Sequence, residues 1–215
     1  MKKVKTGIVG CGFISEIYCK NMCEVFDILD VVACADLEID RAKSRAKAFG
    51  VPKACATEEL LADKDIELVV NLTQPYFHKE VNLAALAAGK HVHCEKPLAI
   101  DRADAEETLD FAKKRGLLVG CAPDTFMGGG VQACRAAIER GEIGAPVSAM
   151  VFMCCHGWET WHPAPEFYYR RGGGPMLDMG PYYLTALVNL LGPIKAVTGM
   201  TRITFPERTV TSVPE

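Results

Sequence analysis

The 215-residue sequence lacks features that mark several broad classes of protein. It has no apolar run long enough to cross a membrane, which excludes a membrane-embedded protein. Its net charge is only -3, so the charge balance does not favour nucleic acid or an anionic membrane surface as a partner. There is no internal repeat and no low-complexity tract. The ten cysteines are scattered without a Cys-x-x-Cys pair, so we expect neither a disulfide scaffold nor a metal site.

What is present describes an ordinary globular protein. Hydrophobic residues make up 49% and charged residues 24% of the sequence, which is enough apolar material for a core. The first residues lead directly into an apolar strand and leave no room for a signal peptide, so we expect a cytoplasmic location.

Strands and helices alternate up to about residue 122. The apolar pattern predicts strands at 4–9, 29–35, near 51–54, 66–72, 91–94 and 117–121. Helices are predicted at 13–25, 38–49, 77–88 and 101–115, the last with Leu109 and Ala112 on its apolar face. This alternation predicts the α/β fold class, a Rossmann-type doubly wound parallel sheet, over residues 1–122.

The pattern changes over residues 123–215. We expect a helix at 129–140, a strand at 146–155, a helix at 176–191 and a strand at 194–205. These elements describe a partial α+β domain with an open, incomplete antiparallel sheet. Because open sheet edges pair with other chains, we expect a fragment of a longer chain or a homo-oligomer formed through this sheet.

The most informative segment is Gly10-Cys11-Gly12-Phe13-Ile14-Ser15, between the first strand and the first helix. Gly10 permits a tight turn and Gly12 permits close approach of a pyrophosphate. The helix that begins at Phe13 and Ile14 directs its positive dipole end at the phosphates. Asp36 ends the second strand, where a carboxylate accepts hydrogen bonds from ribose hydroxyls and repels a 2′-phosphate. The segment predicts NAD as the cofactor in preference to NADP.

Three further motifs make a family resemblance specific. They are Asn71-Leu-Thr-Gln-Pro75 with His78, Gly89-Lys-His-Val-His-Cys-Glu-Lys-Pro-Leu-Ala99, and Gly172-Gly-Gly-Pro-Met-Leu-Asp-Met-Gly180. With the glycine-rich turn and Asp36, they resemble the Gfo/Idh/MocA family, named for glucose–fructose oxidoreductase and inositol dehydrogenase. Family members run well past three hundred residues, so about half of the second domain is absent here.

The resemblance implies which residues form the site. It implies that the nicotinamide side of the cofactor is lined by Thr73, Gln74, Pro75, His78, Glu95 and Lys96. It also implies that Lys96 and Asp178 lie at the reacting centre. Independently, ligands of a doubly wound sheet gather beyond the carboxyl ends of its strands, and Thr73 and Lys96 follow two of those ends. A lysine there can hydrogen-bond the alcohol oxygen and take part in a proton relay.

One position departs from the family pattern. The family has Asp-x-Gly-x-His, whereas this chain has Asp178-Met-Gly-Pro-Tyr182. An imidazole titrates near pH ~6.5 and a phenol near ~10, so Tyr182 is a weaker base but can still donate a hydrogen bond or pass a proton. His162, beside Trp161 in an aromatic loop, is a second candidate base. The same loop is equally consistent with a lid or an oligomer contact.

The predicted function is an NAD-dependent dehydrogenase acting on a secondary alcohol of a sugar, cyclitol or related polyol. Because part of the second domain is absent, this chain can bind the cofactor and still lack turnover. Asp124 and Trp161 are candidate substrate-binding residues, and Asp124 is equally consistent with a helix-entry position. Two alternatives remain: a dinucleotide-binding regulator or scaffold without catalysis, and a glycoside hydrolase that uses NAD transiently.

Overall fold

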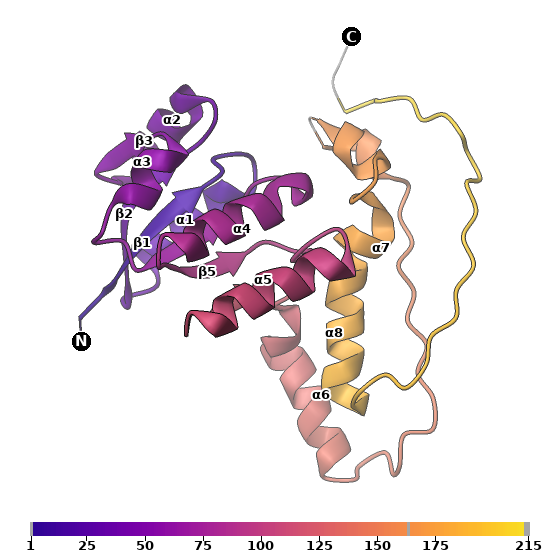
Figure 1. Ribbon diagram of the computed structural model, residues 1–215. Helices are drawn as coiled ribbons and strands as arrows, with labels where there is room; N and C mark the ends of the chain where they lie inside the picture. Colours follow the sequence, from indigo (N-terminus) through magenta and orange to yellow (C-terminus); the bar gives the residue numbers. More distant parts are fainter. Residues whose placement is uncertain (1, 163, 213–215) are drawn as a thin grey trace. The chain divides into compact units, whose positions relative to one another are not determined.

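The computed structural model of the protein describes residues 2–162 and 164–212 (Figure 1). The chain divides into two compact units, Met1–Ala122 and Pro123–Glu215, and each is described by itself below. Within the described residues, no helix combines the length and the apolar character that crossing a membrane requires.

The first unit is built on a six-stranded parallel sheet. The strands are β1 (Val4–Val9), β2 (Leu29–Ala35), β3 (Lys53–Cys55), β4 (Leu68–Asn71), β5 (His91–Cys94) and β6 (Val119–Cys121). Their order across the sheet is β3-β2-β1-β4-β5-β6 and every pair is parallel. This is the strand order of a dinucleotide-binding Rossmann fold, whose order reverses between β1 and β4. The predicted α/β fold class is confirmed.

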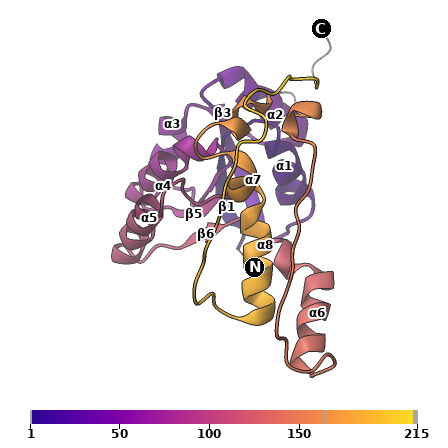
Figure 2. The ribbon, with the colours of Figure 1, turned by 90° about the vertical axis from the view of Figure 1, so that its right-hand side faces the viewer.

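Five helices connect the strands and cover the sheet (Figures 1 and 2). They are α1 (Ser15–Glu24), α2 (Ile39–Phe49), α3 (Thr57–Ala62), α4 (His78–Ala87) and α5 (Arg102–Lys114). One core cluster joins the sheet to α1 and α2 through residues such as Cys19 and Ala42. A second joins it to α3, α4 and α5 through residues such as Leu60 and Leu86. Strands buried on both faces explain why their sequences are almost continuously apolar.

Two details of this unit differ from the sequence prediction. The helix α3 was not predicted, because its six residues are too few to show a helical period. The expectation that Leu109 lies on the buried face of its helix was wrong, since Leu109 is 47% exposed. Thr108 and Ala112, one turn apart, are the buried residues of α5.

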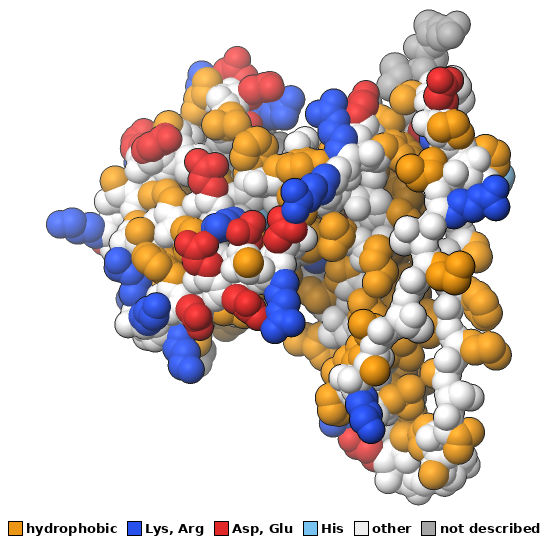
Figure 3. Space-filling view, turned by 45° about the vertical axis from the view of Figure 1, so that its right-hand side comes forward, with side chains coloured by type: hydrophobic (Ala, Val, Ile, Leu, Met, Phe, Trp, Pro, Cys, Tyr) orange, Lys and Arg blue, Asp and Glu red, His pale blue; other side chains and the backbone are white. Residues whose placement is uncertain are grey.

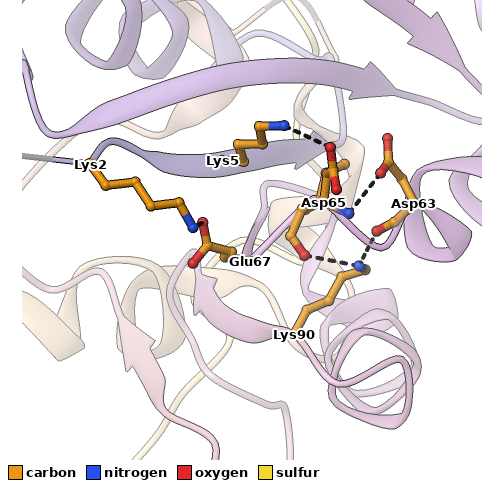
Figure 4. Close-up of polar contacts among 7 residues, drawn as sticks. Lys2, Lys5, Asp63, Asp65, Glu67 and Lys90 are labelled. Carbon is orange, nitrogen blue, oxygen red and sulfur yellow. Dashed lines mark hydrogen bonds and ion pairs between the residues drawn. The ribbon is translucent and has the colours of Figure 1, made fainter.

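A buried lysine forms hydrogen bonds at the edge of the sheet where the strands begin (Figure 4). Lys90 is 2% exposed, and its Nζ donates to the carbonyl of Ile66 at 3.0 Å and to the carbonyl of Asp63. Burial lowers the pKa of Lys90. Beside it Lys5 pairs with Asp65 at 2.7 Å. The contacts fix the loop between α3 and β4 at the edge opposite to the strand ends where ligands bind in such folds.

The second unit contains three helices among its described residues, α6 (Gly129–Glu139), α7 (Gly174–Asp178) and α8 (Gly180–Leu191). It also has three short 3₁₀ turns, η2 (Thr125–Met127), η3 (Trp158–Thr160) and η4 (Pro165–Tyr169). The predicted helix at 176–191 is therefore two helices that meet between Asp178 and Gly180.

The prediction of strands at 146–155 and 194–205, and with them an open antiparallel sheet, was wrong for the described residues. Both segments are extended but belong to no sheet (Figure 1). A strand forms only where its backbone N–H and C=O groups pair with a neighbouring strand, and these two segments make no such pairing. Their apolar side chains are exposed: Val147 95%, Met150 84%, Val197 86% and Met200 99%. Figure 3 shows hydrophobic side chains along extended parts of the chain.

Candidate functional site

The glycine-rich turn lies at the point where the strand order reverses. Gly10 follows β1, has a φ of +98°, and its N–H donates to the carbonyl of Ala35 at 2.9 Å. A Cβ on Gly10 would lie 2.6 Å from the carbonyl carbon of Leu72 and 2.8 Å from the backbone nitrogen of Thr73. Only glycine therefore fits here, because both the φ angle and the backbone after β4 exclude a side chain.

Gly12 has the opposite environment. No atom lies within 4 Å of the position that its Cβ would occupy, so the backbone is open on that side. Ser15, fully buried in place of a third glycine, donates from its Oγ to the Gly12 carbonyl at 2.6 Å. The neighbouring Phe13 and Ile14 are exposed, at 68% and 40%. An open backbone at the start of a helix is the geometry that receives a phosphate.

Asp36 directly follows β2 and lies beside this turn. Its Oδ2 accepts the backbone N–H of Cys11 at 2.7 Å, and its Oδ1 accepts that of Glu38 at 2.9 Å. Each carboxylate oxygen keeps a second lone pair, so the fixed carboxylate can still accept hydrogen bonds from hydroxyl groups. The two bonds join the glycine-rich turn to the segment that follows β2.

A buried polar network holds the loop after β4. Asn71 is fully buried; its Oδ1 accepts both the backbone N–H and the Oγ1 of Thr73, at 3.1 and 2.7 Å. Its Nδ2 donates to Oδ1 of buried Asn82 on α4 at 2.8 Å. Neither asparagine was assigned a role from the sequence. The available signal was Asn71 itself, a polar residue ending an otherwise apolar strand. The network leaves Gln74 exposed and Pro75 at the start of the 3₁₀ turn η1 (Pro75–Phe77).

His78 does not line this site directly, in contrast to what the resemblance implied. It is fully buried, and its two ring nitrogens lie 2.6 Å from the Pro97 carbonyl and 2.9 Å from the Thr73 carbonyl. Burial lowers the pKa of His78, although the two carbonyls oppose the shift. The ring therefore joins the loop after β4 to the loop after β5.

The Glu95-Lys96-Pro97 segment follows β5, and its peptide bond between Lys96 and Pro97 is cis. Glu95 is held from two sides: its Oε1 accepts the hydroxyl of Tyr18 on α1 at 2.8 Å, and its Oε2 accepts the backbone N–H of Lys96 at 2.9 Å. Lys96 itself is half-buried. Tyr18 was missed in the sequence because a tyrosine in a surface helix gives no signal of its own. It links the first turn of α1 to the segment that carries Lys96.

The candidates of the second unit are distributed over its loops and helices. His162 is 9% exposed, accepts the backbone N–H of Ala164 on Nδ1 at 3.0 Å, and lies against the rings of Phe167 and Tyr168 at centroid distances of 5.5 and 5.2 Å. Burial lowers its pKa, with the carboxylates of Glu166 and Asp178 opposing. This environment favours a packed core histidine over a base that reaches substrate.

The other candidates of this unit are more accessible. Trp161 is 57% exposed, beside buried Trp158, which stacks on Tyr168. Asp178 ends α7 and Tyr182 lies in the first turn of α8, both half-buried. Asp124 is exposed and its carbonyl accepts the N–H of Met127, which gives it the helix-entry role that was the alternative. Among the residues that the structure describes, no three His, Cys, Asp or Glu side chains are grouped to hold a metal ion.

Fold and site together define a dinucleotide-binding protein of the Rossmann class, and comparison with known proteins gives the family. The model of the Gfo/Idh/MocA oxidoreductase family, NAD-binding Rossmann fold, matches residues 4–122. The model of the family's C-terminal domain matches residues 131–213. The chain belongs to the Gfo/Idh/MocA oxidoreductase family.

Relatives in the family are named for several substrates. 1,5-Anhydro-D-fructose reductase of Ensifer adhaerens is 34% identical over 157 residues, which are 70% of this chain and 45% of that protein. Trans-1,2-dihydrobenzene-1,2-diol dehydrogenase of Bos taurus is 33% identical over 192 residues, 88% of this chain and 56% of that protein. The chain thus spans about half the length of the curated relatives it matches.

Solved structures share the fold. An NAD-binding protein from Listeria innocua superimposes with a TM-score of 0.71 at 26% identity, covering 88% of this chain and 55% of that one. Scyllo-inositol dehydrogenase from Lactobacillus casei, solved with NAD(H) and scyllo-inositol, has a TM-score of 0.62 at 24% identity, covering 66% and 43%. The first unit is the family's NAD-binding Rossmann fold, and its open backbone at Gly12 and fixed Asp36 fit that cofactor.

Proposed function

We propose that this chain carries the NAD site of an oxidoreductase that oxidises a secondary alcohol of a sugar, cyclitol or related polyol. The observation that supports this proposal is that four of the predicted site segments lie at the same edge of the sheet. The glycine-rich turn, Asp36, the Thr73 loop and Glu95-Lys96 follow the carboxyl ends of β1, β2, β4 and β5, which are consecutive across the sheet. Relatives named as polyol and diol dehydrogenases support the substrate class.

In this proposal the following backbone and side-chain groups bind the cofactor. The backbone of Gly12, Phe13 and Ile14 receives the diphosphate, and the Asp36 carboxylate accepts the adenosine ribose hydroxyls. Thr73, Gln74 and Pro75, held by the buried asparagines, face the nicotinamide side together with Glu95. The carboxylate of Asp36 favours NAD over NADP because it repels a 2′-phosphate.

Bound NAD would supply the hydride acceptor for the substrate carbon. Oxidation also requires loss of the hydroxyl proton, and we assign to Lys96 a hydrogen bond to the substrate oxygen and a part in the relay that carries this proton away. Its position two residues after β5 is fixed through Glu95, which Tyr18 holds. We propose Asp178 and Tyr182 as the groups of the second unit that take part, on the family pattern. His162 is the weaker candidate because its ring is packed among aromatic side chains.

The substrate class follows from the same proposal. Trp161 is exposed and offers an aromatic face that suits the apolar face of a sugar or cyclitol ring. Asp124 is exposed and offers a carboxylate to hydroxyl groups. Assembly into a homo-oligomer and a cytoplasmic location both stay predictions from the sequence, and sizing of the purified chain tests the first.

The test is formation of NADH, followed by absorbance at 340 nm, with a panel of inositols, sugars and diols. A Lys96→Ala variant is compared with Lys114→Ala, in which an exposed lysine in the last turn of α5 is lost. In a full-length context we expect activity with at least one polyol, abolished by Lys96→Ala and retained by Lys114→Ala. Unchanged activity of Lys96→Ala would reject the catalytic role of that lysine.

Other results of the same assay point to the alternative functions. NAD binding without turnover of any polyol, in a full-length context as well as in this chain, supports a non-catalytic dinucleotide-binding regulator or scaffold. Cleavage of a chromogenic glycoside without net NADH supports the NAD-dependent glycoside hydrolase.

A further inference from the structure

A pocket beside the glycine-rich turn contains residues that the proposed function has not used. Its volume is about 400 Å³, and it is lined by Cys11, Asp40, Arg41, Ser44 and Arg45. Cys11 belongs to the turn, and the other four lie on α2 between Asp40 and Arg45. The pocket therefore joins the start of the phosphate-binding turn to the helix that follows Asp36.

Arg45 is the residue of this pocket that contacts the turn itself. One guanidinium nitrogen, Nη2, lies 3.4 Å from the Gly12 carbonyl oxygen, and Nη1 lies 3.3 Å from Oε2 of Glu16 in the first turn of α1. The side chain of Arg45 is only 17% exposed, and its guanidinium lies 5.8 Å from the ring centroid of Phe49. Arg41, one turn earlier, instead pairs with Glu38 and is 56% exposed.

The Gly12 carbonyl is the hydrogen-bond acceptor that fixes this part of the turn. It accepts Ser15 Oγ at 2.6 Å, the Ser15 N–H at 3.2 Å and the Arg45 guanidinium, while no atom lies within 4 Å of where a Gly12 side chain would be. A glycine without packing on its open side has many conformations to lose when a ligand binds. A contact that fixes the Gly12 carbonyl before the ligand binds reduces the loss of conformational entropy on binding, and so raises the affinity for the ligand.

We propose that Arg45 is a positioning residue for the diphosphate of the dinucleotide. Its planar fork connects the Gly12 carbonyl with Glu16, so the turn and the start of α1 are held in the conformation that directs their amides at the diphosphate. Its positive charge lies beside the same segment. The inference rests on the proposed NAD site and deepens it, because it names a residue of α2 on which the affinity for the diphosphate depends.

The test uses the full chain and isothermal titration with NAD, ADP-ribose and adenosine. The variants are Arg45→Met, which keeps the apolar stem, and Arg45→Lys, which keeps the charge but not the fork. Lys47→Met, an exposed residue on the same helix, is the control for loss of one positive charge. We expect Arg45→Met to weaken the binding of NAD and ADP-ribose by about 10-fold to 150-fold, the range of one hydrogen bond to a charged group. Adenosine, which has no diphosphate, should change less than about 2-fold.

Arg45→Lys should show most of the same loss, and Lys47→Met none. Affinity of Arg45→Met equal to that of the parent would overturn the inference, as would an equal loss for adenosine, which would indicate a merely structural residue. Full recovery in Arg45→Lys would also overturn it, because charge alone would then suffice. Failure of the parent chain to bind either NAD or ADP-ribose would instead reject the proposed function.

Discussion

Two glycines of one turn are under different constraints. Gly10 faces the backbone after β4 and has a positive φ, whereas Gly12 faces open space. We therefore expect the first glycine to be required for folding of the turn and the second for access of the ligand. Substitution of each by alanine therefore separates stability from binding.

Gly10→Ala should destabilise the first unit. The added methyl group meets backbone atoms at 2.6–2.8 Å, and the φ angle of +98° strains any side chain. Together these effects cost about 2–5 kcal/mol. Urea unfolding followed by circular dichroism measures the loss. A Gly10→Ala protein with unchanged stability would show that the turn relaxes away from Leu72.

Gly12→Ala should fold normally but bind NAD poorly. Its methyl group meets no protein atom, so the free energy of unfolding should change by less than about 1 kcal/mol. The methyl group does occupy the space in which a diphosphate approaches the backbone, and we expect at least a roughly tenfold loss of NAD affinity by titration calorimetry. Parent-like affinity would place the diphosphate elsewhere.

At the scale of elements, the candidate site consists of loops that follow parallel strands. Buried and half-buried side chains join these loops by hydrogen bonds. Asn71 holds the loop after β4, His78 joins that loop to the loop after β5, and Tyr18 joins α1 to Glu95. The contacts run between elements far apart in the sequence. They fix the relative positions of the loops after β4 and β5 and of α1.

His78 should make the stability of the first unit depend on pH. Burial lowers its pKa in the folded state, whereas in the unfolded chain it titrates near ~6.5. As the pH falls below ~6.5, the unfolded state takes up a proton that the folded state does not, so stability falls with pH by up to about 1.4 kcal/mol per unit. Hydrogen exchange of the β1 and β4 amides between pH 7.5 and 5.5 measures this.

The decisive comparison for His78 is the slope of the free energy of unfolding against pH, rather than the free energy of unfolding at one pH. His78→Gln should reduce the slope, while His156→Gln, at an exposed histidine, should leave it as in the parent. Equal slopes in His78→Gln and the parent would contradict the assignment of a lowered pKa to this ring.

At the scale of the whole molecule, the two units differ in how completely they bury their apolar residues. The first has two core clusters, one on each side of its sheet. The second leaves large hydrophobic side chains exposed along residues 146–155 and 194–205. We therefore propose that the first unit folds and binds NAD without the second.

A fragment of residues 1–122 tests this. All groups assigned to the diphosphate and the ribose lie within it, so its NAD affinity should stay within about threefold of the full chain, less than the effect of one hydrogen bond. Circular dichroism establishes folding and calorimetry the affinity. An unfolded fragment, or one that has lost NAD binding while the full chain retains it, would contradict the proposal.

Much of the fold and part of the site followed from the sequence. Strand 4–9 and strand 29–35 were predicted with the bounds that the structure has, and Gly10, Gly12 and Asp36 were placed by the order of strand, turn, helix and strand. Such local patterns depend on residues within one crossover, where periodicity and turn chemistry determine the outcome. The strands predicted at 146–155 and 194–205 do not form in the described structure. A strand requires a pairing partner elsewhere in the chain, and the local pattern does not show whether that partner is present.

The sequence by itself determined the alternation of strands and helices, the glycine turn and the carboxylate after β2, because each is specified by neighbouring residues. Only the tertiary structure decided that His78 is buried between the Thr73 and Pro97 carbonyls, that Tyr18 holds Glu95, and that Arg45 reaches the Gly12 carbonyl. Those contacts join residues 19, 77 and 33 positions apart. Proximity over such separations is created by packing of whole elements, which no local pattern encodes.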